Sequence, residues 1–338
     1  MTEASLNAHP GEPVLDVRGL AVEFPYHGST VRPVRGASFA VNPRQRLGLV
    51  GESGSGKSLT ALSLMRLIPP PGRIAAGQVL MGGVDLAQLS EREMARVRGG
   101  RIALVGQDPM SSLNPVHSIG RQIVEAIRVH ENVSQRVARA RAVDLLGQVG
   151  LPNPARRFDS YPHQFSGGMR QRVMIAIAIS SSPEVLIADE PTTALDVTTQ
   201  ARIMDLLSSL VEEREMAVIL ITHDLGLAAS FCDEIQVMYA GRVVERSRPG
   251  PLFAQPLHPY TEALLDAICR LDYDVGKPIA AIPGQPPLPQ MLPSGCPFHT
   301  RCPHAFDRCS TEEPLAHVLR GGRMAECHLA DERATAAA

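Results

Sequence analysis

The chain has 338 residues, of which 44% are hydrophobic and 20% charged, and its formal net charge is −2. A chain of this length and composition can bury a sizeable core, which indicates an α/β domain with an appendage. The nearly balanced charge implies neither a basic surface for nucleic acid nor an acidic tail, so we expect no nucleic-acid partner.

No segment of the sequence has the character of a membrane span. The longest apolar stretch, residues 173–179, is far shorter than the ~18 residues that such a span needs. The N-terminus lacks a charged region followed by an apolar one, which is the pattern of a secretory signal. We therefore expect a chain that is soluble and not secreted.

The N-terminal part of the chain is predicted to be rich in β-strands. Apolar residues alternate at residues 15–24, and a proline-interrupted loop separates them from a second strand at residues 34–41. Further elements are predicted as a buried strand at 47–50, a helix at 58–68 that three prolines stop, a hairpin at 78–86 and a strand at 101–105.

Helical spacing then replaces the strand pattern. Ile119, Ile123 and Ile127 recur at intervals of four residues, and we place a helical subdomain at about residues 112–172. Strands return at residues 185–188, 217–222 and 234–238, separated by helical patterns. Strands that alternate with helices predict a mainly parallel sheet.

The composition changes after Ile268. Residues 278–293 contain six prolines, and four of the six cysteines follow this linker-like run. We therefore divide the chain into a domain at residues 14–250 and a C-terminal extension at residues 251–338.

A glycine-rich loop lies between the predicted strand at residues 47–50 and the helix that follows. Its backbone N–H groups can wrap a β-phosphate, Lys57 can reach the β- and γ-phosphate oxygens, and the Ser58 hydroxyl can ligate Mg²⁺. A glycine turn that only joined a strand to a helix would not require the Lys-Ser pair. We predict a nucleotide-binding loop made of Gly51, Glu52, Ser53, Gly54, Ser55, Gly56, Lys57 and Ser58.

Two acidic residues, Asp189 and Glu190, end the apolar strand that begins at Val185. Asp189 is placed to hold Mg²⁺ through the hydration shell of the ion, and Glu190 is placed to orient and deprotonate an attacking water. An acidic pair at a strand end is by itself most often a solvated turn. Here it follows both the glycine loop and a further motif at residues 165–172, which favours the catalytic role.

That further motif reads Phe-Ser-Gly-Gly-Met-Arg-Gln-Arg and opens a helix. A glycine pair at a helix start offers free N–H groups and a positive dipole end, and Ser166 adds a hydroxyl, so the turn can bind an anion. Together with the glycine loop and the acidic strand end, the motif resembles the signature of the ATP-binding cassette (ABC) family. The predicted nucleotide contacts of this turn are Ser166, Gly167, Gly168 and Gln171.

The resemblance assigns roles to further residues. Gln107 resembles the family's glutamine-loop residue, which senses Mg²⁺ and water, and His223 matches the switch histidine that contacts the γ-phosphate and the catalytic carboxylate. Residues 194–196, Ala-Leu-Asp, match the loop that crosses the dimer interface. For stacking on adenine, Tyr26 is the nearest aromatic candidate, and the segment containing Val31 is the alternative. The implied catalytic set is Lys57, Gln107, Glu190 and His223, and the implied Mg²⁺ set is Ser58, Gln107 and Asp189.

The resemblance also implies a fold and an assembly. The expected fold is an α/β ABC ATPase (P-loop NTPase) core with a β-rich ATP-binding subdomain, a helical subdomain and a Cys-rich C-terminal extension. In this family the signature turn covers the γ-phosphate bound to the other subunit, so that each ATP lies between two chains. The expected working unit is therefore a dimer.

Motifs in the rest of the chain narrow the resemblance. Residues 107–115 and 253–261, together with Pro-Gly-Gln-Pro-Pro at residues 283–287, look like those of the oligopeptide/dipeptide/nickel importer ATPases. This group implies import of di- or oligopeptides by a peripheral subunit at the cytoplasmic face of the inner membrane. The implied partners are a second ATPase in a heterodimer, two membrane permeases and an extracytoplasmic solute-binding protein.

Two alternatives remain open. The transported solute could be nickel or another small solute, because the selecting pocket belongs to other subunits. The chain could also be a soluble ABC ATPase of DNA repair or translation. Such proteins usually carry two cassettes or a long coiled-coil insertion, and this chain has one cassette, which favours the importer.

The four tail cysteines, Cys296, Cys302, Cys309 and Cys327, suit a metal site because soft thiolates in fours bind Zn²⁺ or iron–sulfur clusters. Structural zinc usually shows a tighter Cys-x₂₋₄-Cys spacing, and similar tails in peptide-importer ATPases carry a [4Fe-4S] cluster. We predict a structural [4Fe-4S] cluster with all four cysteines as ligands. The alternatives are zinc, for which His299, His304 and His328 could substitute, and thiols without metal.

Overall fold

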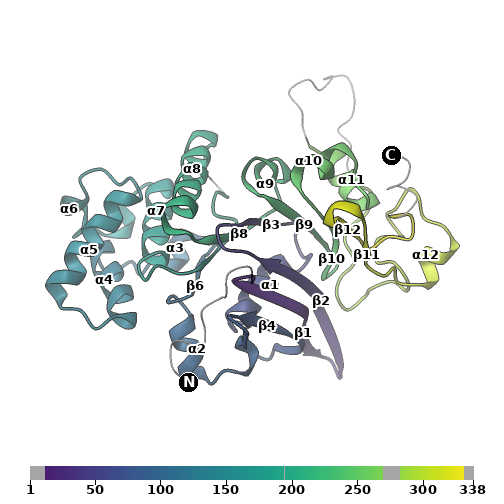
Figure 1. Cartoon of the computed structure of the whole chain (residues 1–338), viewed down its shortest axis with the longest axis horizontal. Coiled ribbons are helices and arrows are strands. Elements are labelled where there is room, and N and C mark those ends of the chain that lie inside the picture. The colour runs from purple at the N-terminus through teal and green to yellow at the C-terminus, as the bar shows by residue number, and fades with distance from the viewer. Residues whose placement is uncertain (1–11, 194, 269–281, 331–338) are drawn as a thin grey trace. The chain divides into compact units, whose positions relative to one another are not determined.

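The computed structural model describes residues 12–193, 195–268 and 282–330 (Figure 1). The described chain forms two compact units, each built from several segments. The first comprises residues 12–15, 41–45 and 88–219, and the second comprises residues 16–40, 46–87 and 220–330. The second unit thus joins residues from both ends of the chain.

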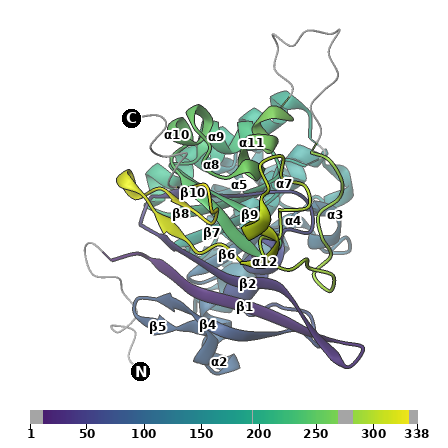
Figure 2. The same cartoon turned by 90° about the vertical axis from the view of Figure 1, so that its right-hand side faces the viewer.

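A four-stranded antiparallel sheet in the second unit carries the N-terminal strands. It consists of β1 (Leu15–Tyr26), β2 (Ser29–Val41), β4 (Arg73–Met81) and β5 (Val84–Asp85) in the order β2-β1-β4-β5 (Figure 2). The predicted hairpin at residues 78–86 is confirmed, since Leu80 pairs with Asp85 and Met81 with Val84. β2 starts earlier than predicted and includes Pro33, which its position at the sheet edge tolerates.

A second set of strands in this unit surrounds the strand that leads into the glycine loop. The order is β11 (His317–Val318), β12 (Met324–Ala325), β10 (Arg242–Ser247), β9 (Glu234–Tyr239) and β3 (Arg46–Val50). β3 and β9 are parallel, as expected, but β10, β12 and β11 are antiparallel. The prediction of a mainly parallel sheet was therefore incomplete, because the last three strands had not been recognised.

The helices of the second unit are short. They are α1 (Lys57–Leu64), α9 (Leu225–Phe231), α10 (Pro249–Ala254), α11 (Pro259–Asp266) and α12 (Asp307–Thr311), with 3₁₀ turns at Leu86–Gln88 and Arg320–Gly322. The helix predicted to reach residue 68 ends at Leu64, because Arg66 adopts a left-handed conformation with φ 51.

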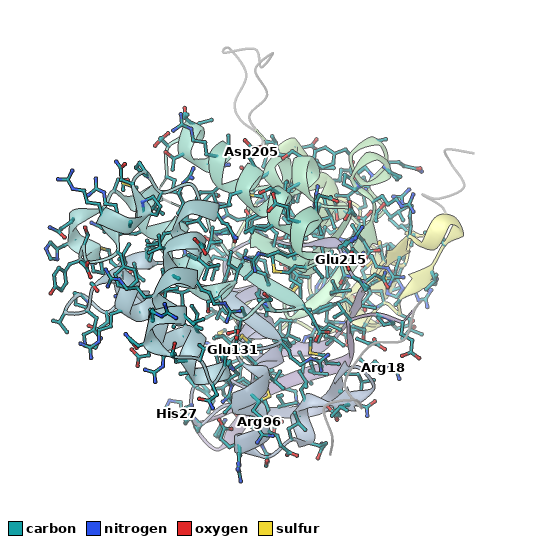
Figure 3. All side chains as sticks on the ribbon, turned by 60° about the vertical axis from the view of Figure 1, so that its left-hand side comes forward. Arg18, His27, Arg96, Glu131, Asp205 and Glu215 are labelled. Carbon is teal, nitrogen blue, oxygen red and sulfur yellow. The ribbon has the colours of Figure 1, made fainter. Side chains whose placement is uncertain are left out.

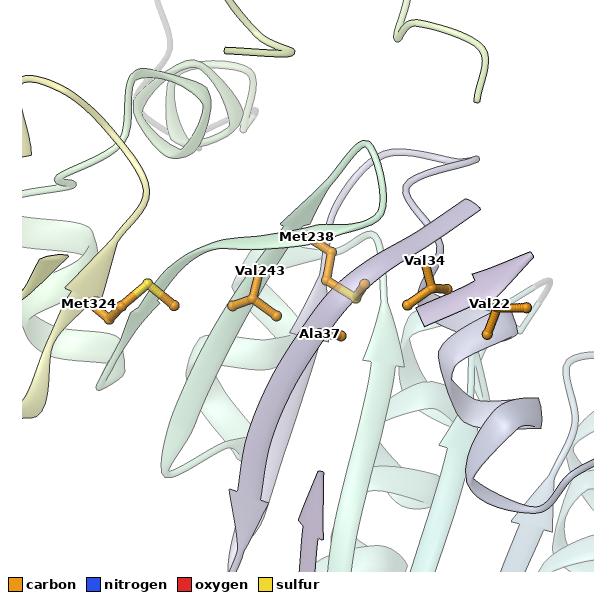
Figure 4. Close-up of a cluster of buried hydrophobic side chains, with 6 residues drawn as sticks. All are labelled: Val22, Val34, Ala37, Met238, Val243 and Met324. Atoms are coloured by element: carbon orange, nitrogen blue, oxygen red, sulfur yellow. The ribbon is translucent and has the colours of Figure 1, made fainter. Parts of the chain in front are cut away.

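A hydrophobic cluster joins the N-terminal sheet to the C-terminal residues. It contains Val22, Val34, Ala37, Met238, Val243 and Met324, all of them buried (Figure 4). Met324 comes from β12, in the predicted extension, and lies in the same core as Val22 of β1. The described part of the extension is thus packed into the second unit, where it shares a core with the strands that lead to the glycine loop.

The strands of the first unit follow the predicted α/β pattern. β6 (Ile102–Val105) and β7 (Val185–Asp189) are parallel, with Ile102 opposite Val185 and Val105 opposite Ala188. β8 (Ala217–Thr222), of which residues 217–219 belong to this unit, lies next to β7. These strands match the predicted ones to within one residue, because each is a short, continuous apolar run.

Helices make up most of the rest of the first unit. They are α2 (Glu91–Val97), α3 (Pro109–Ser112), α4 (Ile119–His130), α5 (Gln135–Gln148), α6 (Pro154–Arg157), α7 (Gly167–Ala178) and α8 (Val197–Arg214), with a 3₁₀ turn at Pro162–Gln164. The predicted helical spacing is confirmed on α4, where Ile119, Ile123 and Ile127 are all fully buried. Each contributes about 1.5–3 kcal/mol by its transfer from water.

Charged residues occupy the outward positions of these helices. Arg96 on α2 and Asp205 on α8 are exposed (Figure 3), whereas Leu206 and Leu207 of α8 are buried. Within the described residues, no helix is both long enough and apolar enough to cross a membrane.

Candidate functional site

The phosphate loop connects β3 to α1, and two of its glycines touch main chain from other elements. A Cβ atom on Gly51 would lie 2.2 Å from the Met238 carbonyl oxygen, and one on Gly56 would lie 2.8 Å from the Pro33 carbonyl oxygen. Gly56 also has φ 104, which favours glycine. The loop is therefore packed against β9 and β2 so closely that a side chain fits at neither position.

Lys57 lies at the start of α1 and is buried, with 6% of its surface exposed. Its ammonium group donates hydrogen bonds to the Gly51 carbonyl at 2.8 Å and to the Glu52 carbonyl at 2.9 Å. The charge is thus held against the main chain of the loop. Ser58, the predicted Mg²⁺ ligand, is exposed at the same helix start, as are Ser53 and Gly54 in the loop.

The acidic end of β7 brings together two predicted residues. The Glu190 carboxylate accepts a hydrogen bond from Gln107 Nε2 at 3.0 Å and another from the Thr193 hydroxyl at 2.9 Å. Thr193 was not identified from the sequence, although its spacing of three residues from Glu190 permits such a bond. Asp189, the predicted Mg²⁺ residue, is the last residue of β7 and is partly exposed.

Glu190 also has an unusual main-chain conformation. Its φ of 47 lies in the left-handed region, which non-glycine residues seldom adopt. Such a conformation is strained and persists where the surrounding structure fixes the residue, most often at functional sites. The conformation and the two hydrogen bonds give the carboxylate a defined position.

The signature turn forms the start of α7, with Ser166 as its N-cap. The Ser166 hydroxyl accepts a hydrogen bond from the Met169 N–H at 3.4 Å. Ser166 and Gly167 are exposed, whereas Gly168 is buried and Gln171 is only 1% exposed. The accessible part of the predicted anion site is therefore the Ser166–Gly167 end of the turn.

Gly168 has a packing role that the sequence did not reveal. A Cβ atom at this position would lie 2.3 Å from Thr199 Cγ2, in the first turn of α8. Asp196, the N-cap of α8, fixes Thr199 by accepting hydrogen bonds from its N–H at 2.9 Å and its hydroxyl at 2.7 Å. These hydrogen bonds lower the pKa of Asp196. The signature turn thus depends on the position of α8.

Gly168→Ala is expected to destabilise the protein by about 1–3 kcal/mol, the usual cost of overpacking. Adding Thr199→Ser should restore most of this loss, because serine keeps the hydroxyl bond to Asp196 and removes the clashing methyl group. Urea unfolding of the two single variants and the double variant measures the coupling. Purely additive effects would contradict the assigned contact.

The remaining predicted residues are placed as follows. His223 follows β8 and is exposed, and Tyr26 lies at the end of β1 with 46% of its surface exposed and its ring edge-on to His27. Leu195 and Asp196 precede α8, and Ala194 lies outside the described residues.

The predicted site residues are divided between the two units. Gln107, Glu190 and the signature turn belong to the first unit, whereas the phosphate loop, Tyr26 and His223 belong to the second. That the two sets form one nucleotide site remains a prediction.

The four tail cysteines line one small cavity in the second unit. Besides Cys296, Cys302, Cys309 and Cys327, its walls include His258, Pro259, Phe298, His299, His304, His328 and Leu329. Among the described residues, none of the four cysteines forms a disulfide, and Cys309 and Cys327 are buried. Burial, together with the three neighbouring thiols, raises the pKa of the Cys296 thiol to about 12. The four cysteines thus lie around one cavity, and their predicted role as ligands of one cluster stays a prediction.

The cavity itself does not fit a cluster in its present dimensions. Its volume of about 20 Å³ is the space of one or two water molecules. Among the described residues, no group of three or more His, Cys, Asp or Glu side chains is arranged to hold a metal ion. Thiolate and imidazole groups are suitable ligands for an iron–sulfur cluster or for zinc. The positions of the side chains support neither metal site, so the predicted [4Fe-4S] cluster stays a prediction.

One contact in this unit, an ion pair with the phosphate loop, was not predicted from the sequence. Arg301, next to Cys302, forms a two-point ion pair with Glu52 of the phosphate loop. The two residues are 249 positions apart. No periodicity or motif in the sequence links such distant residues.

Two family models match the chain. The model described as ABC transporter matches residues 34–193, which include the phosphate loop, the signature turn and Glu190. The model described as Oligopeptide/dipeptide transporter, C-terminal region matches residues 244–309.

Curated relatives are similar over almost the whole length. The dipeptide transport ATP-binding protein DppD of Escherichia coli (strain K12) is 49% identical over 93% of this chain and 96% of its own. DppD of Bacillus subtilis (strain 168) is 44% identical over 96% of both chains. A putative peptide import ATP-binding protein of Brucella abortus (strain 2308) is 51% identical over 93% of this chain and 94% of its own.

Solved structures agree with these matches. The dimeric structure of MJ0796, a bacterial ABC transporter cassette, superposes with a TM-score of 0.63 at 26% identity and covers 70% of this chain and 98% of that one. The chain therefore belongs to the ATP-binding proteins of the ABC transporter family, and its enzymatic activity is ATP hydrolysis. It carries, in addition, the C-terminal region of the oligopeptide/dipeptide transporter group.

Proposed function

We propose that this chain is the ATP-binding and ATP-hydrolysing subunit that energises import of di- or oligopeptides across the cytoplasmic membrane. The observation that carries the proposal is the presence, in one chain, of an ABC ATPase segment and the oligopeptide/dipeptide transporter C-terminal region. Relatives that are about half identical over almost their full length are named as dipeptide transport or peptide import proteins.

We assign the chemistry to the residues that the motifs indicate, and the hydrogen bonds of Glu190 and Lys57 support this assignment. Glu190 orients and deprotonates the attacking water, while Gln107, its hydrogen-bond donor, reports the presence of Mg²⁺ and water. Lys57 binds the β- and γ-phosphate oxygens, and Ser58 and Asp189 hold Mg²⁺. His223 contacts the γ-phosphate, and the exposed ring of Tyr26 is available for stacking on adenine.

We assign the second half of the nucleotide site to another chain. Ser166 and Gly167 are exposed at the N-terminal end of α7, where N–H groups and the helix dipole attract an anion. MJ0796 is described as dimeric, and a related structure of it is described as bound to ADP and Pi in a post-hydrolysis state. We infer a heterodimer with a second ATPase, bound at the cytoplasmic face to two permeases that receive solute from an extracytoplasmic binding protein.

The proposed function is tested with the complex that an affinity tag on this chain retrieves from native membranes. After reconstitution into vesicles, the complex should take up a labelled dipeptide only with Mg·ATP and the binding protein, and the partners should accelerate ATP hydrolysis. Uptake of nickel but not of dipeptide would contradict the peptide assignment. Full activity of the chain alone at high dilution would instead indicate a soluble ABC ATPase.

We further propose that the four tail cysteines bind one [4Fe-4S] cluster, with Zn²⁺ as the alternative metal. The proposal rests on their number, on the absence of disulfides among them and on the cavity that they share. When bound, such a group would supply thiolate bonds that fasten the loops of the extension, in addition to the hydrophobic cluster of Leu257, Ala325, Cys327 and Ala330.

Anaerobically purified protein is expected to be brown and to contain about four irons per chain. Cys302→Ser should remove the colour and make the tail more sensitive to protease. Cys232→Ser is the matched control, because Cys232 is buried against Gly48 and lies outside the cavity; its iron content should not change. Colourless protein with one zinc per chain would establish the alternative, and metal-free protein would refute both.

A further inference from the structure

Glu52, inside the phosphate loop, is held at three separate atoms. Its carbonyl accepts a hydrogen bond from the Lys57 ammonium at 2.9 Å, and its N–H donates to the Tyr260 hydroxyl at 2.8 Å. Its carboxylate forms the ion pair with Arg301. Two of these three contacts, those of Tyr260 and Arg301, come from residues 251–338, the predicted C-terminal extension.

The Arg301 contact has the geometry of a strong ion pair. Nη1 donates to Glu52 Oε2 at 2.8 Å, and Nη2 donates to Oε1 at 3.0 Å. The Arg301 side chain is only 3% exposed, whereas that of Glu52 is 26% exposed. Two parallel charge-assisted bonds fix the orientation of the carboxylate as well as its distance.

Arg301 is itself fixed from the opposite side. Its Nε donates to the Pro283 carbonyl at 2.8 Å, and Nη1 also lies 3.3 Å from the Tyr239 hydroxyl. Burial lowers the pKa of Arg301, but its hydrogen bonds to Glu52 and Tyr239 outweigh this effect and raise the pKa overall. The guanidinium therefore stays charged and has little freedom to leave Glu52.

Tyr260 is anchored through a buried carboxylate. The Glu245 carboxylate, on β10, accepts hydrogen bonds from the N–H groups of Leu257 and His258, both at 2.9 Å, just before α11. Tyr260 follows in the first turn of α11 and is fully buried, so its hydroxyl points at Glu52 from a fixed helix start. Burial raises the pKa of Tyr260, which keeps the hydroxyl neutral.

An aromatic cluster packs the two contacts together. The ring centroid of Tyr260 lies 4.5 Å from that of Tyr239 and 5.4 Å from that of Phe298. The guanidinium carbon of Arg301 lies 5.8 Å from the centroid of the Tyr239 ring and 5.9 Å from that of Phe298. Close packing of this kind passes a displacement of one side chain on to its neighbours.

We propose that Arg301 and Tyr260 are positioning residues of the nucleotide site, and that they act on Lys57 through Glu52. Because the Lys57 ammonium rests on the Glu52 carbonyl, a shift of Glu52 moves the positive charge that receives the phosphates. The C-terminal extension is thus a part of the ATP site. This inference rests on the proposed function only in taking the nucleotide to be ATP.

The alternative is that the Arg301 ion pair only attaches the extension to the unit. Another ion pair provides the comparison. Arg242 on β10 donates to Glu326 from Nε at 2.6 Å and from Nη2 at 2.9 Å, which is the same two-point geometry without a contact to the phosphate loop. If attachment alone matters, breaking either pair should have the same effect on ATP binding.

The test measures the Kd of the full-length chain for a fluorescent ATP analogue with Mg²⁺, together with the Tm of each variant. Tyr260→Phe removes one hydroxyl and keeps the aromatic packing, so Kd should rise about three- to tenfold with little change in Tm. Arg301→Gln should raise Kd roughly tenfold or more, the range for bonds to a charged group. Arg301→Lys, which keeps the charge and one bond, should restore part of the affinity.

The double variant Glu52→Gln/Arg301→Gln should bind no more weakly than Arg301→Gln, because both changes remove the same interaction. Arg242→Gln should leave Kd unchanged. An unaltered Kd for folded Tyr260→Phe and Arg301→Gln would overturn the inference, and so would an equal loss in Arg242→Gln. A wild-type chain that does not bind the analogue would instead count against the proposed function.

Discussion

Glu190→Gln is expected to lower ATP hydrolysis by the assembled complex by about 10²-fold or more, the scale of losing a positioned general base. ATP binding should persist, because the amide oxygen can still accept hydrogen bonds from Gln107 and Thr193, which now surround the carboxylate. The substitution removes the basicity and changes little else. Single-turnover hydrolysis and equilibrium binding, measured in parallel, separate the two effects.

A matched control comes from the same unit. Asp205→Asn removes one negative charge from an exposed position on α8 and should hydrolyse ATP at the wild-type rate. A turnover of Glu190→Gln close to that of the wild type would contradict the assignment of Glu190 as the general base. Equal losses in both variants would show that the effect comes from the charge of the unit and not from the position of the carboxylate.

Lys57→Ala is expected to lower kcat/KM for Mg·ATP by about 10²- to 10³-fold. This is the usual effect of removing one fixed hydrogen-bond donor that stabilises the negative charge of the transition state. The loss should appear already in binding, because the Lys57 ammonium is held at the loop carbonyls before any reaction. Thermal unfolding gives a direct measurement, since saturating Mg·ATP raises the Tm of a chain that binds it. This shift should be present in the wild type and absent in the variant.

Lys57→Arg is the informative companion. The 33 basic residues of the chain include only two lysines, Lys57 and Lys277, so arginine is the ordinary choice elsewhere. A guanidinium group is wider and planar. It does not fit the buried position between the Gly51 and Glu52 carbonyls as a compact ammonium group does. Lys57→Arg should therefore also lose the Tm shift, and retention of the full shift in either variant would contradict the assigned role.

The extension changes how substitutions far from the phosphate loop should be interpreted. Tyr260 and Arg301 lie outside the motifs that define an ATP site, yet both form hydrogen bonds with Glu52. Glu245 accepts a hydrogen bond from the N–H of His258, two residues before Tyr260. A loss of ATP affinity caused by changes in the tail is then expected without any direct contact to nucleotide. The sequence assigned the tail a structural role alone.

Local motifs were predictable from the sequence because their chemistry is local. Each of these motifs depends on neighbours within a few residues. They are the glycines of the phosphate loop, the Ser166 N-cap of α7 and the apolar strands β6, β7 and β8. Their patterns are distinctive enough to indicate an ABC ATPase, and the comparisons confirm that family.

Only the tertiary structure decided which distant groups meet. β12 has two residues, too few for any alternation, and it exists because β10 offers an unpaired edge. Gly168 is required by a methyl group of Thr199, and Glu52 is fixed by Arg301. Such contacts are set by packing between segments far apart in the chain, and packing leaves no periodic signal in the sequence of either partner.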